Sequence, residues 1–254
     1  MKPGSRGPTP GPHPVDAPGE AEAAGRVREM FGRIAPRYDL LNHLLSFNAD
    51  KLWRRRVARI FAGIAGDPRA RVLDLCCGTG DLAFALRREA RAGAEIIGSD
   101  FSPQMLTRAR AKAAARAVPL EFVEADALAL PWPDAHFDLV TCAFGFRNLA
   151  SYDGGLREIY RVLKPGGTAA ILEFSEPRGV FGHLYRFYFR AVLPRLGGMI
   201  SGDSTAYEYL PASVRNFPAP EELRRGFEAA GFKDARFRSW TGGIVTLHTG
   251  RRIS

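Results

Sequence analysis

The sequence predicts an α/β fold in which a mostly parallel, doubly wound sheet ends in an antiparallel hairpin. Between residues 71 and 174, short apolar runs alternate with helical stretches, a pattern typical of βαβ units with helices on both faces of the sheet. Two late apolar runs, 235–240 and 243–249, are separated only by Thr241-Gly242, which suits the tight turn of a hairpin. Helices are expected to precede the sheet.

The elements of the expected sheet follow one another in a regular order. The expected strands are 71–75, 95–100, 120–124, 137–143 and 168–174. The expected helices between them are 81–91, 103–117 and 152–163. Segment 177–217 is rich in aromatic residues and poorly periodic in places, so we interpret it as an insertion beside the sheet.

Two segments precede the sheet. Residues 1–25 contain six Pro, five Gly and no aromatic residue, so nothing there offsets the entropy of ordering, and we predict a disordered tail. In segment 26–66, apolar residues recur at helical spacings, and Pro36 with stretch 46–48 divides them into two or three helices. We therefore expect one folded domain over residues 26–254, with N-terminal helices at 26–66.

The composition is that of a folded protein with an excess of basic residues. The chain has 254 residues, is 46% hydrophobic and carries a formal net charge of +9, which excludes wholesale disorder and suggests an anionic partner. Nine basic residues against three acids give segment 26–62 a charge of +6. No apolar run approaches the roughly 20 residues of a membrane span, and the three Cys cannot form a disulfide framework. We expect a cytoplasmic protein.

The stretch most informative for function is the turn after the first expected strand. Gly78-Thr79-Gly80 leads from that strand into a helix, and glycines let the backbone approach a ligand closely at the free N–H groups of a helix start. With Ala83, the turn also satisfies the Gly-x-Gly-x-x-Gly/Ala fingerprint of dinucleotide sites. By itself the turn indicates an adenosine cofactor without separating NAD from others, and a turn that needs Gly for backbone reasons alone is the other interpretation.

Carboxylates lie in, end or follow three of the expected strands. Asp74 lies inside the first strand, where it suits a cationic ligand, and Asp100 ends the second, where its two oxygens can accept both ribose hydroxyls. Asp126 follows the third strand and can accept from an adenine amino group, while Ala127 leaves room for the ring. Each Asp alone is also explained as a helix cap or turn residue, but together they line a ligand crevice. We assign Asp81 to the first helical turn.

These positions, with Lys164-Pro-Gly-Gly167, resemble the class I S-adenosylmethionine-dependent methyltransferases, whose fold is Rossmann-like. Further motifs resemble the demethylmenaquinone and ubiquinone-precursor C-methyltransferase family, and the resemblance covers residues 27–251. They are Phe31-Gly-Arg-Ile-Ala-Pro-Arg-Tyr-Asp-Leu-Leu-Asn42, Leu52-Trp-Arg54, Phe144-Gly-Phe-Arg-Asn148, Tyr160-Arg-Val-Leu-Lys-Pro-Gly-Gly167, Leu172-Glu-Phe-Ser175, Tyr209-Leu-Pro-Ala-Ser-Val-Arg215 and Gly243-Ile-Val-Thr-Leu-His248.

The resemblance implies S-adenosyl-L-methionine as the cofactor. It carries the family's cofactor contacts onto Thr79, Asp100, Asp126 and Ala127. With the residues deduced above, the expected cofactor set is Asp74, Gly78, Thr79, Gly80, Asp100, Asp126 and Ala127. The chain departs from the family pattern at two places: Cys77 stands where many members have Gly and crowds the loop, and Ala143 replaces a Ser that some members present to the cofactor.

Methylation of a quinone precursor at a ring carbon requires the reduced hydroquinone, whose phenolate pushes electron density onto that carbon. A base, a bound water or a cation that stabilises the phenolate accelerates the reaction. Arg147 and Asn148 follow the fourth strand, at the rim where the methyl group arrives, and the resemblance adds Tyr38 to this catalytic set. The alternative is a structural salt bridge for Arg147 and a helix cap for Asn148. His43 and His248 are the candidate imidazole bases.

Segment 177–194 interleaves aromatic residues with Arg, and no acid occurs between Glu176 and Asp203. Such a pattern suits a lipid interface, a nucleic-acid surface or an aromatic stripe packed on the sheet. The resemblance favours the lipid interface. It implies a polyprenylated hydroquinone substrate and no nucleic acid, with peripheral binding to the anionic inner face of the cytoplasmic membrane. A homo-oligomer is left open.

We therefore predict an enzyme that C-methylates a demethylmenaquinol-type polyprenyl hydroquinone in menaquinone biosynthesis. The alternatives are a ubiquinone-precursor benzoquinol or another lipophilic small molecule as acceptor. A nucleic-acid methyltransferase is disfavoured because neither an Asn-Pro-Pro-Tyr motif nor a Pro-Cys nucleophile occurs, and a catalytically silent scaffold is a further alternative. No metal site is expected, since two of the three Cys are adjacent and the five His are scattered.

Overall fold

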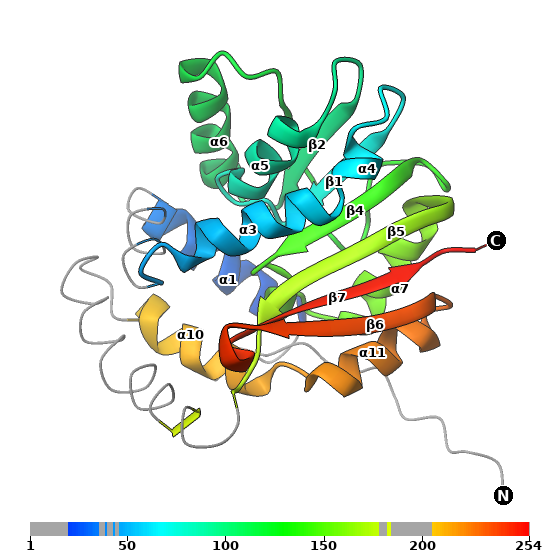
Figure 1. The fold of residues 1–254 in the computed structure, drawn as a ribbon. Coiled ribbons are helices and arrows are strands. Elements are labelled where there is room, and N and C mark those ends of the chain that lie inside the picture. Colours follow the sequence, from blue (N-terminus) through cyan, green and yellow to red (C-terminus); the bar gives the residue numbers. More distant parts are fainter. Residues whose placement is uncertain are drawn as a thin grey trace, which may run out of the picture.

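Seven strands among the described residues form one sheet in the order β3-β2-β1-β4-β5-β7-β6 (Figure 1). The structure is a computed structural model that describes residues 20–35, 39, 43, 46–177, 182–183 and 205–253. The strands are β1 (Arg71–Leu75), β2 (Glu95–Asp100), β3 (Glu121–Glu124), β4 (Phe137–Ala143), β5 (Leu163–Phe174), β6 (Lys233–Trp240) and β7 (Val245–Arg251).

The sheet is parallel from β3 to β5 and antiparallel at its other edge. The pairs β2–β3, β1–β2, β1–β4 and β4–β5 are parallel, whereas β7 lies antiparallel to both β5 and β6. Within β1, Val72 belongs to the core cluster on one face of the sheet and Leu73 to the cluster on the other, as expected for a central strand buried on both faces. The predicted parallel sheet with a C-terminal hairpin is confirmed.

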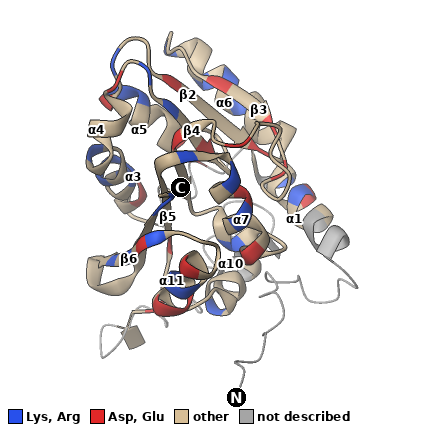
Figure 2. Ribbon diagram, turned by 90° about the vertical axis from the view of Figure 1, so that its right-hand side faces the viewer, with Lys and Arg blue, Asp and Glu red and all other residues tan. Residues whose placement is uncertain are grey.

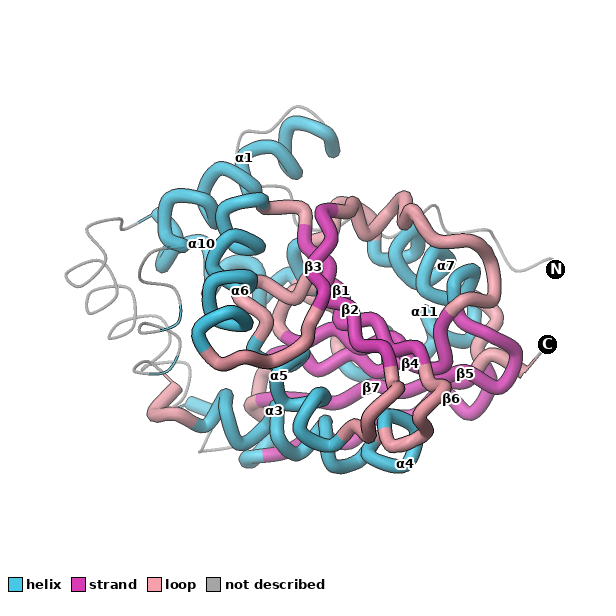
Figure 3. The backbone as a smooth tube through the Cα atoms, turned by 90° about the horizontal axis from the view of Figure 1, so that it is seen from above, coloured by secondary structure: helices cyan, strands magenta, loops and turns pink. Residues whose placement is uncertain are grey.

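Helices cover the two faces of this sheet. Helices α3 (Ala49–Ile60), α5 (Asp81–Glu89) and α6 (Pro103–Ala115) contribute to one core cluster, and α4 (Ala62–Ala65) continues α3. Helices α7 (Tyr152–Val162) and α11 (Pro220–Ala229) contribute to the other cluster. Viewed along the sheet, α3 and α5 lie on the opposite side of the strands from α7 and α11 (Figure 3).

Two further helices lie near the carboxyl ends of the parallel strands. Helix α1 (Glu20–Ile34) packs against α6 and α10 (Thr205–Asn216), and α10 packs against the short 3-10 helix η2 (Phe146–Asn148) that follows β4. These contacts place both helices beside the edge of the sheet at which the predicted site residues lie (Figure 1).

Short polar residues determine where two of the helices begin. Ser102 precedes α6 and its hydroxyl accepts a hydrogen bond from the Met105 amide at 3.5 Å, with Pro103 in the first turn. Ser151 precedes α7 and accepts from the Gly154 amide at 3.1 Å. Both satisfy amides that have no partner inside the helix, so each helix starts directly after the loop that follows a strand.

The predicted boundary of the N-terminal tail is wrong. Helix α1 begins at Glu20, so residues 20–25 are helical in the structure, while residues 1–19 lie outside the described residues. The run Glu-Ala-Glu-Ala-Ala at positions 20–24 consists of strong helix formers, which explains the earlier start. In the segment predicted as N-terminal helices, the structure has the rest of α1 together with α3 and α4.

Other boundaries differ by a few residues. Strand β5 begins at Leu163 rather than at residue 168, because Leu163 pairs with Phe137 of β4. The turn of the C-terminal hairpin takes in Gly243, which has a φ of 95°. In the predicted insertion 177–217, residues 205–216 form α10, and most of the remainder lies outside the described residues. None of the described helices has the length and apolar character needed to cross a bilayer.

Candidate active site

A pocket lies where the order of the parallel strands reverses. Strand β1 is flanked by β2 on one side and β4 on the other, and open α/β sheets bind ligands in the crevice outside such a point. The pocket is open to solvent, and the space between its walls is about 740 Å³ with the open part included. Its lining comprises Phe31, Cys76, Gly78, Asp100, Phe101, Met105, Ala125, Asp126, Ala127, Leu128, Phe144, Gly145, Asn148, Leu149 and Ala150.

Asp100 lies at the end of β2 with its carboxylate held in one orientation. One oxygen, Oδ2, accepts from the Gly78 amide at 2.8 Å, and Oδ1 accepts from the Ser102 amide at 2.9 Å. Burial raises the pKa of this carboxyl to about 6, although these amides favour the charged form. Each carboxylate oxygen has a second lone pair, so Asp100 retains the capacity to accept two hydroxyl groups.

The glycine turn after β1 requires glycine for two reasons. Gly80, which precedes α5, has a φ of 87°, and a Cβ there would lie 2.9 Å from ring atoms of Phe122. Gly78 has a φ of 56° and lines the pocket next to Asp100. Cys77, the departure from the family pattern, places its Sγ only 3.0 Å from where a Cβ of Gly98 would be. Gly98 of β2 thus leaves the room that the Cys77 side chain occupies.

Asp74 is buried inside β1 and has an oxygen without a partner. The Thr141 hydroxyl donates to Oδ1 at 2.9 Å, whereas Oδ2 has no hydrogen-bond partner among the described residues. Burial raises the pKa of this carboxyl to about 7. A second, smaller cavity of about 320 Å³ adjoins it, and Arg54, Thr79 and Ala143 also line this cavity. A buried carboxylate oxygen without a donor is suited to a cationic group of a ligand.

Asp126 and Ala127 line the main pocket beyond the end of β3. Asp126 Oδ1 accepts from the Leu128 amide at 2.9 Å, which turns the chain back toward the pocket. Ala127 is buried, and its short side chain forms part of the pocket wall. The structure thus brings Gly78, Asp100 and this pair to one pocket, as the sequence predicts.

Asn148, at the end of η2, lines the same pocket. Its Oδ1 accepts a hydrogen bond from the Tyr209 hydroxyl of α10 at 3.1 Å. Burial raises the pKa of Tyr209 to about 12, so this hydroxyl keeps its proton and stays a donor. With its oxygen occupied, the amide group of Asn148 can still donate to a ligand.

The Arg147 guanidinium is buried and occupied by protein groups. Its Nη1 donates to Glu173 Oε1 at 2.9 Å and also to the Phe144 carbonyl, and Nε donates to Ser213 Oγ at 3.4 Å. The Arg147 backbone amide donates to the other Glu173 oxygen at 3.2 Å. Arg147 is not among the residues that line the pocket, so its contacts match the salt-bridge alternative.

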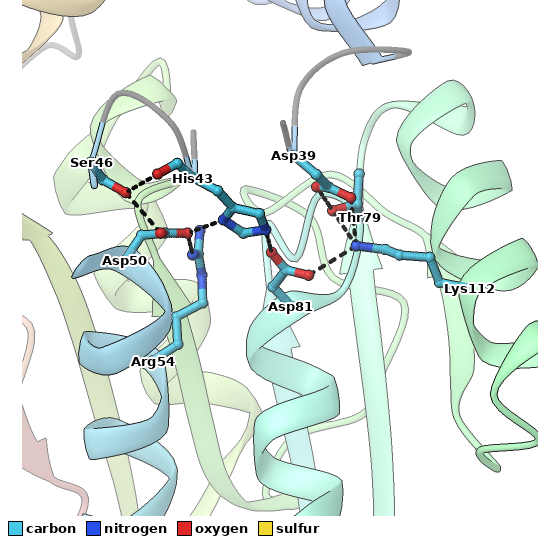
Figure 4. Close-up of polar contacts among 8 residues, drawn as sticks. All are labelled: Asp39, His43, Ser46, Asp50, Arg54, Thr79, Asp81 and Lys112. Atoms are coloured by element: carbon cyan, nitrogen blue, oxygen red, sulfur yellow. Dashed lines mark hydrogen bonds and ion pairs between the residues drawn. The ribbon is translucent and has the colours of Figure 1, made fainter. Parts of the chain in front are cut away.

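A polar network on the other side of the glycine turn joins four parts of the chain (Figure 4). Lys112 of α6 donates to Asp39 at 2.8 Å, to Thr79 at 2.9 Å and to Asp81 at 2.9 Å. The Thr79 hydroxyl donates to the other oxygen of Asp39 at 2.5 Å. The Thr79 side chain is thus turned toward the N-terminal segment rather than toward the main pocket.

The same network continues through His43 to α3. His43 Nδ1 lies 2.8 Å from Asp50 and its Nε2 lies 3.7 Å from Asp81, which is in the first turn of α5 as predicted. Ligand atoms of these three residues lie within 4.8 Å of one another, a grouping that sequence analysis did not predict. Since Arg54 pairs with Asp50 at 2.5 Å and Lys112 with Asp81, the geometry favours an ion-pair network over a metal site.

The candidate bases do not lie at the main pocket. His248 of β7 faces α11, where its Nε2 lies 3.3 Å from the Pro220 carbonyl oxygen, and burial lowers its pKa to about 4. His43 belongs to the network beside the glycine turn. Tyr38 lies outside the described residues.

Sequence analysis missed the partners of these residues. Asp39 is part of the first family motif, but nothing in the sequence linked it to Thr79. Only Lys112 could have been suspected from the sequence. It is one of only five Lys in a chain with 31 Arg, and a compact ammonium group suits three oxygen acceptors at once. Glu173 also lies in a family motif, yet its pairing with Arg147 depends on the adjacency of β4 and β5.

Comparison with known proteins places this chain among methyltransferases. The model of the ubiE/COQ5 methyltransferase family matches residues 20–252. Demethylmenaquinone methyltransferase of Thermus thermophilus is 55% identical over 224 residues, 88% of this chain and 100% of that protein. The enzyme of the same name from Deinococcus radiodurans is 53% identical, over 88% of this chain and 91% of that protein. The ubiquinone/menaquinone biosynthesis C-methyltransferase UbiE of Geobacter sulfurreducens is 45% identical, over 91% of this chain and 90% of that protein.

Solved structures share the fold at low sequence identity. The cyclase SpnF superimposes with a TM-score of 0.68 at 19% identity, covering 97% of this chain and 99% of that one. A SAM-dependent methyltransferase of Thermotoga maritima, a possible histamine N-methyltransferase, has a TM-score of 0.62 at 19% identity, covering 88% and 98%. The predicted class I methyltransferase fold is therefore confirmed.

Proposed function

The chain belongs to the ubiE/COQ5 methyltransferase family, and from this membership we propose that it uses S-adenosyl-L-methionine to methylate a ring carbon of a demethylmenaquinol-type polyprenyl hydroquinone. The match to the enzyme of Thermus thermophilus supports the proposal, because it spans the full length of that protein. The observation that carries it is the pocket at the strand reversal, which brings Asp100, Asp126 and Asn148 together.

The residues of the two cavities fit the cofactor. The unpartnered oxygen of Asp74 suits an ammonium group, and Arg54 in the same small cavity suits a carboxylate, which are the two charges of an amino-acid end. Asp100 retains lone pairs for ribose hydroxyls. Asp126 and Ala127 line the same pocket and suit the amino group and the ring of adenine. Gly78-Thr79-Gly80 lets the backbone approach the ligand between these positions.

When bound, the cofactor supplies an activated methyl group, so the chief task of the protein is to align the acceptor carbon with it. Phe31, Met105 and Leu149 give the pocket apolar walls that suit an aromatic ring and exclude water. Asn148 then donates from its amide nitrogen to the ring oxygen beside the reacting carbon. This donation strengthens as the ring oxygen loses its proton, which stabilises the phenolate.

Arg147 acts in this scheme by holding η2 rather than by touching the acceptor. Its contacts with Glu173, the Phe144 carbonyl and Ser213 tie η2 to β5 and α10, and Asn148 is the next residue. A direct contact of Arg147 with the phenolate requires release from Glu173, which the burial of both side chains opposes. Tyr38 is retained as a catalytic residue on the strength of the family motif alone.

We also propose that the protein works in the cytoplasm, bound peripherally to the inner face of the cytoplasmic membrane. The acceptor's polyprenyl tail requires access to a bilayer, and the net charge of +9 favours an anionic surface. A homo-oligomer stays a prediction from the sequence.

Quinones extracted after deletion of the gene test the proposal in the host. Mass spectrometry is expected to show accumulation of demethylmenaquinone, and complementation with the wild-type gene, but not with Asp100→Ala, should restore the methylated quinone. Accumulation of a ubiquinone precursor would instead favour the benzoquinol alternative, which the combined name of the Geobacter relative keeps open. An unchanged quinone pool would contradict both.

A further inference from the structure

One half of the surface of helix α3 is exposed to solvent. The outward residues are Lys51, Leu52, Arg55, Arg56, Arg59 and Ile60, which we call the α3 surface. Leu52 is 64% exposed and Ile60 is 48% exposed, and Phe47 just before the helix is 79% exposed. The only other exposed large hydrophobic residues in the described part of the chain are Phe237 and Ile253, so exposed apolar side chains are concentrated at α3.

The α3 surface is basic and carries no acid. Within the described ranges, Lys51, Arg55 and Arg59 form no ion pair, and neither does Arg88, which lies across the cleft on α5. The acid of the helix, Asp50, is buried and bonded to Arg54. Blue segments are accordingly dense on α3 in Figure 2. Unpaired cations at a surface are free to bind phosphates.

A cleft beside the helix concentrates these charges. It lies between α3, α5 and the end of α6 and measures about 940 Å³ with its open part included. Its charged lining has more bases than acids: Lys51, Arg54, Arg55, Arg88 and Arg116 against Asp39 and Asp81. Long basic side chains around a cleft of this size suit anionic head groups, while Leu52 and Ile60 project beside it from the same helix. Apolar and basic side chains on one helix surface are typical of helices that lie in a membrane interface.

The inner face of α3 contacts the wall of the active-site pocket. The rings of Trp53 and Phe144 lie 6.0 Å apart, and the Arg54 guanidinium lies 5.1 Å from the centre of the Phe144 ring. Phe144 lines the main pocket. The α3 surface is thus separated from the pocket by about one helix diameter, roughly 10 Å. A bilayer at this surface brings a lipid-tailed acceptor close to the site.

We propose that the α3 surface docks the protein on a bilayer that contains anionic phospholipids. Leu52 and Ile60 enter the interface, and Lys51, Arg55, Arg59 and Arg88 meet lipid phosphates. The inference rests on the proposed function, which supplies the need for a lipid-tailed acceptor. A two-fold symmetric contact of this surface with the same surface of a second copy is disfavoured, because like charges would face one another. Nucleic acid fits less well, since its phosphate backbone offers no partner to exposed aliphatic side chains.

Vesicle co-sedimentation with the full chain tests the proposal. Wild-type protein is expected to bind phosphatidylcholine vesicles in which about 30% of the lipid is anionic phosphatidylglycerol. It is expected to bind vesicles of pure phosphatidylcholine poorly. Arg55→Gln/Arg59→Gln should lower the affinity by at least about tenfold. The matched control Arg236→Gln/Arg238→Gln removes the same charge from exposed positions of β6 and should bind like wild type. Leu52→Ser should weaken binding by about tenfold without a change in net charge.

Three results would overturn the proposal: no wild-type binding to anionic vesicles, equal losses in the two double variants, or displacement of bound vesicles by an equimolar RNA oligonucleotide. Methyl transfer to a short-tailed, water-soluble demethylmenaquinol without vesicles separates this proposal from the proposed function. All of the variants should retain wild-type turnover in that assay. Loss of vesicle binding with intact soluble turnover supports the α3 surface, whereas absence of soluble turnover in the wild type counts against the function alone.

Discussion

Two charged networks flank the glycine turn, and they differ in burial. The Arg147–Glu173 pair on the acceptor side has side chains only 6% and 0% exposed, and it joins β5, η2 and α10. The Lys112–Asp39 pair on the cofactor side has side chains 20% and 31% exposed, and it joins α6 and the glycine turn to the N-terminal segment.

Because the two pairs differ in burial, they are expected to contribute differently to the stability of the protein. Removing one partner of a buried pair leaves an uncompensated charge in the interior and costs about 3–5 kcal/mol. The pairs of Lys112, whose side chain is 20% exposed, are partly screened by water and contribute less than the buried pair. We therefore expect the Arg147–Glu173 pair to matter more for the stability of η2, and the Lys112 network to matter more for the position of Thr79 in the glycine turn.

Glu173→Ala should have the largest effect on stability. It leaves the Arg147 guanidinium buried without its carboxylate, and we expect the free energy of unfolding to fall by about 3–5 kcal/mol in denaturant titrations. The double variant Arg147→Met/Glu173→Met should lose less than Glu173→Ala alone, because no charge is left behind. The control Glu222→Gln, at an exposed position, should stay within about 0.5 kcal/mol of wild type. A small loss in Glu173→Ala would show that the pair is not structurally important.

Asp100→Ala tests the pocket between the two networks. The carboxylate is expected to accept ribose hydroxyls, so its removal should weaken cofactor binding by about 1–3 kcal/mol in isothermal titration calorimetry. Asp100→Asn, which keeps the shape and one oxygen, should lose less. Unchanged affinity in Asp100→Ala would remove this residue from the cofactor site.

The pH dependence of stability separates buried from half-exposed carboxyls. Burial raises the pKa of Asp74 to about 7 from 3.8, so between these values the folded state binds more protons than the unfolded one. Asp74 by itself should therefore make stability without cofactor fall as pH rises from about 4 to 7, by up to about 1.4 kcal/mol per pH unit. Asp100, whose pKa is raised to about 6, acts in the same direction, whereas His248, whose pKa is lowered from 6.5 to about 4, acts in the opposite direction between those values. The test is therefore the difference between the pH slopes of wild type and Asp74→Asn in thermal melts: the variant should lose the downward contribution, and an identical slope would contradict the assignment.

Asp81, in the Lys112 network, titrates in the opposite direction. Burial opposes ionisation of Asp81, but the charges of Arg54 and Lys112 and the Lys112 hydrogen bond outweigh it, so the pKa of Asp81 is lowered. Its stabilising contribution is present above its unfolded pKa, near 3.8, and is lost as pH falls through the still lower folded pKa. Between about pH 4 and 7 this contribution is fully present and constant, so it does not add to the slope there.

Lys112→Met should have a smaller effect on stability than Glu173→Ala, because the Lys112 side chain is 20% exposed and water partly screens its ion pairs. Its expected effect is on the cofactor, because Lys112 bonds Thr79 and Asp39 together. The Kd for S-adenosyl-L-methionine should rise several-fold while the melting temperature changes little. Lys233→Met removes an exposed lysine of β6 and should change neither. If Lys112→Met bound the cofactor like wild type, the network would have no role in the cofactor turn.

The fold and the pocket wall at the ends of β2 and β3 were predictable from sequence because both follow from local patterns. Strand–helix alternation predicts a parallel sheet, and the carboxyl ends of parallel strands meet at one edge, so Asp100 and Asp126 had to be neighbours. Element ends were less predictable: β5 extends back to Leu163 because of its pairing with Phe137, which no local signal in residues 163–167 reveals.

The acceptor side was less predictable because its contacts join distant parts of the chain. Arg147 appeared in the sequence as a cation at the rim, yet its guanidinium lies with Glu173, 26 residues away. His248 appeared as a candidate base, but the side-chain alternation of β7 turns it toward α11. Partner and facing direction are properties of the assembled sheet, not of the residue type.

The most direct test of the central claim is methyl transfer by the purified protein. Chemically reduced demethylmenaquinone and isotopically labelled S-adenosyl-L-methionine are incubated with the protein, and the product is analysed by mass spectrometry. We predict labelled menaquinone with the methyl group on a ring carbon, and no transfer to the oxidised quinone. Labelled methyl on a ring oxygen, or no transfer to the reduced acceptor with cofactor bound, would contradict the account.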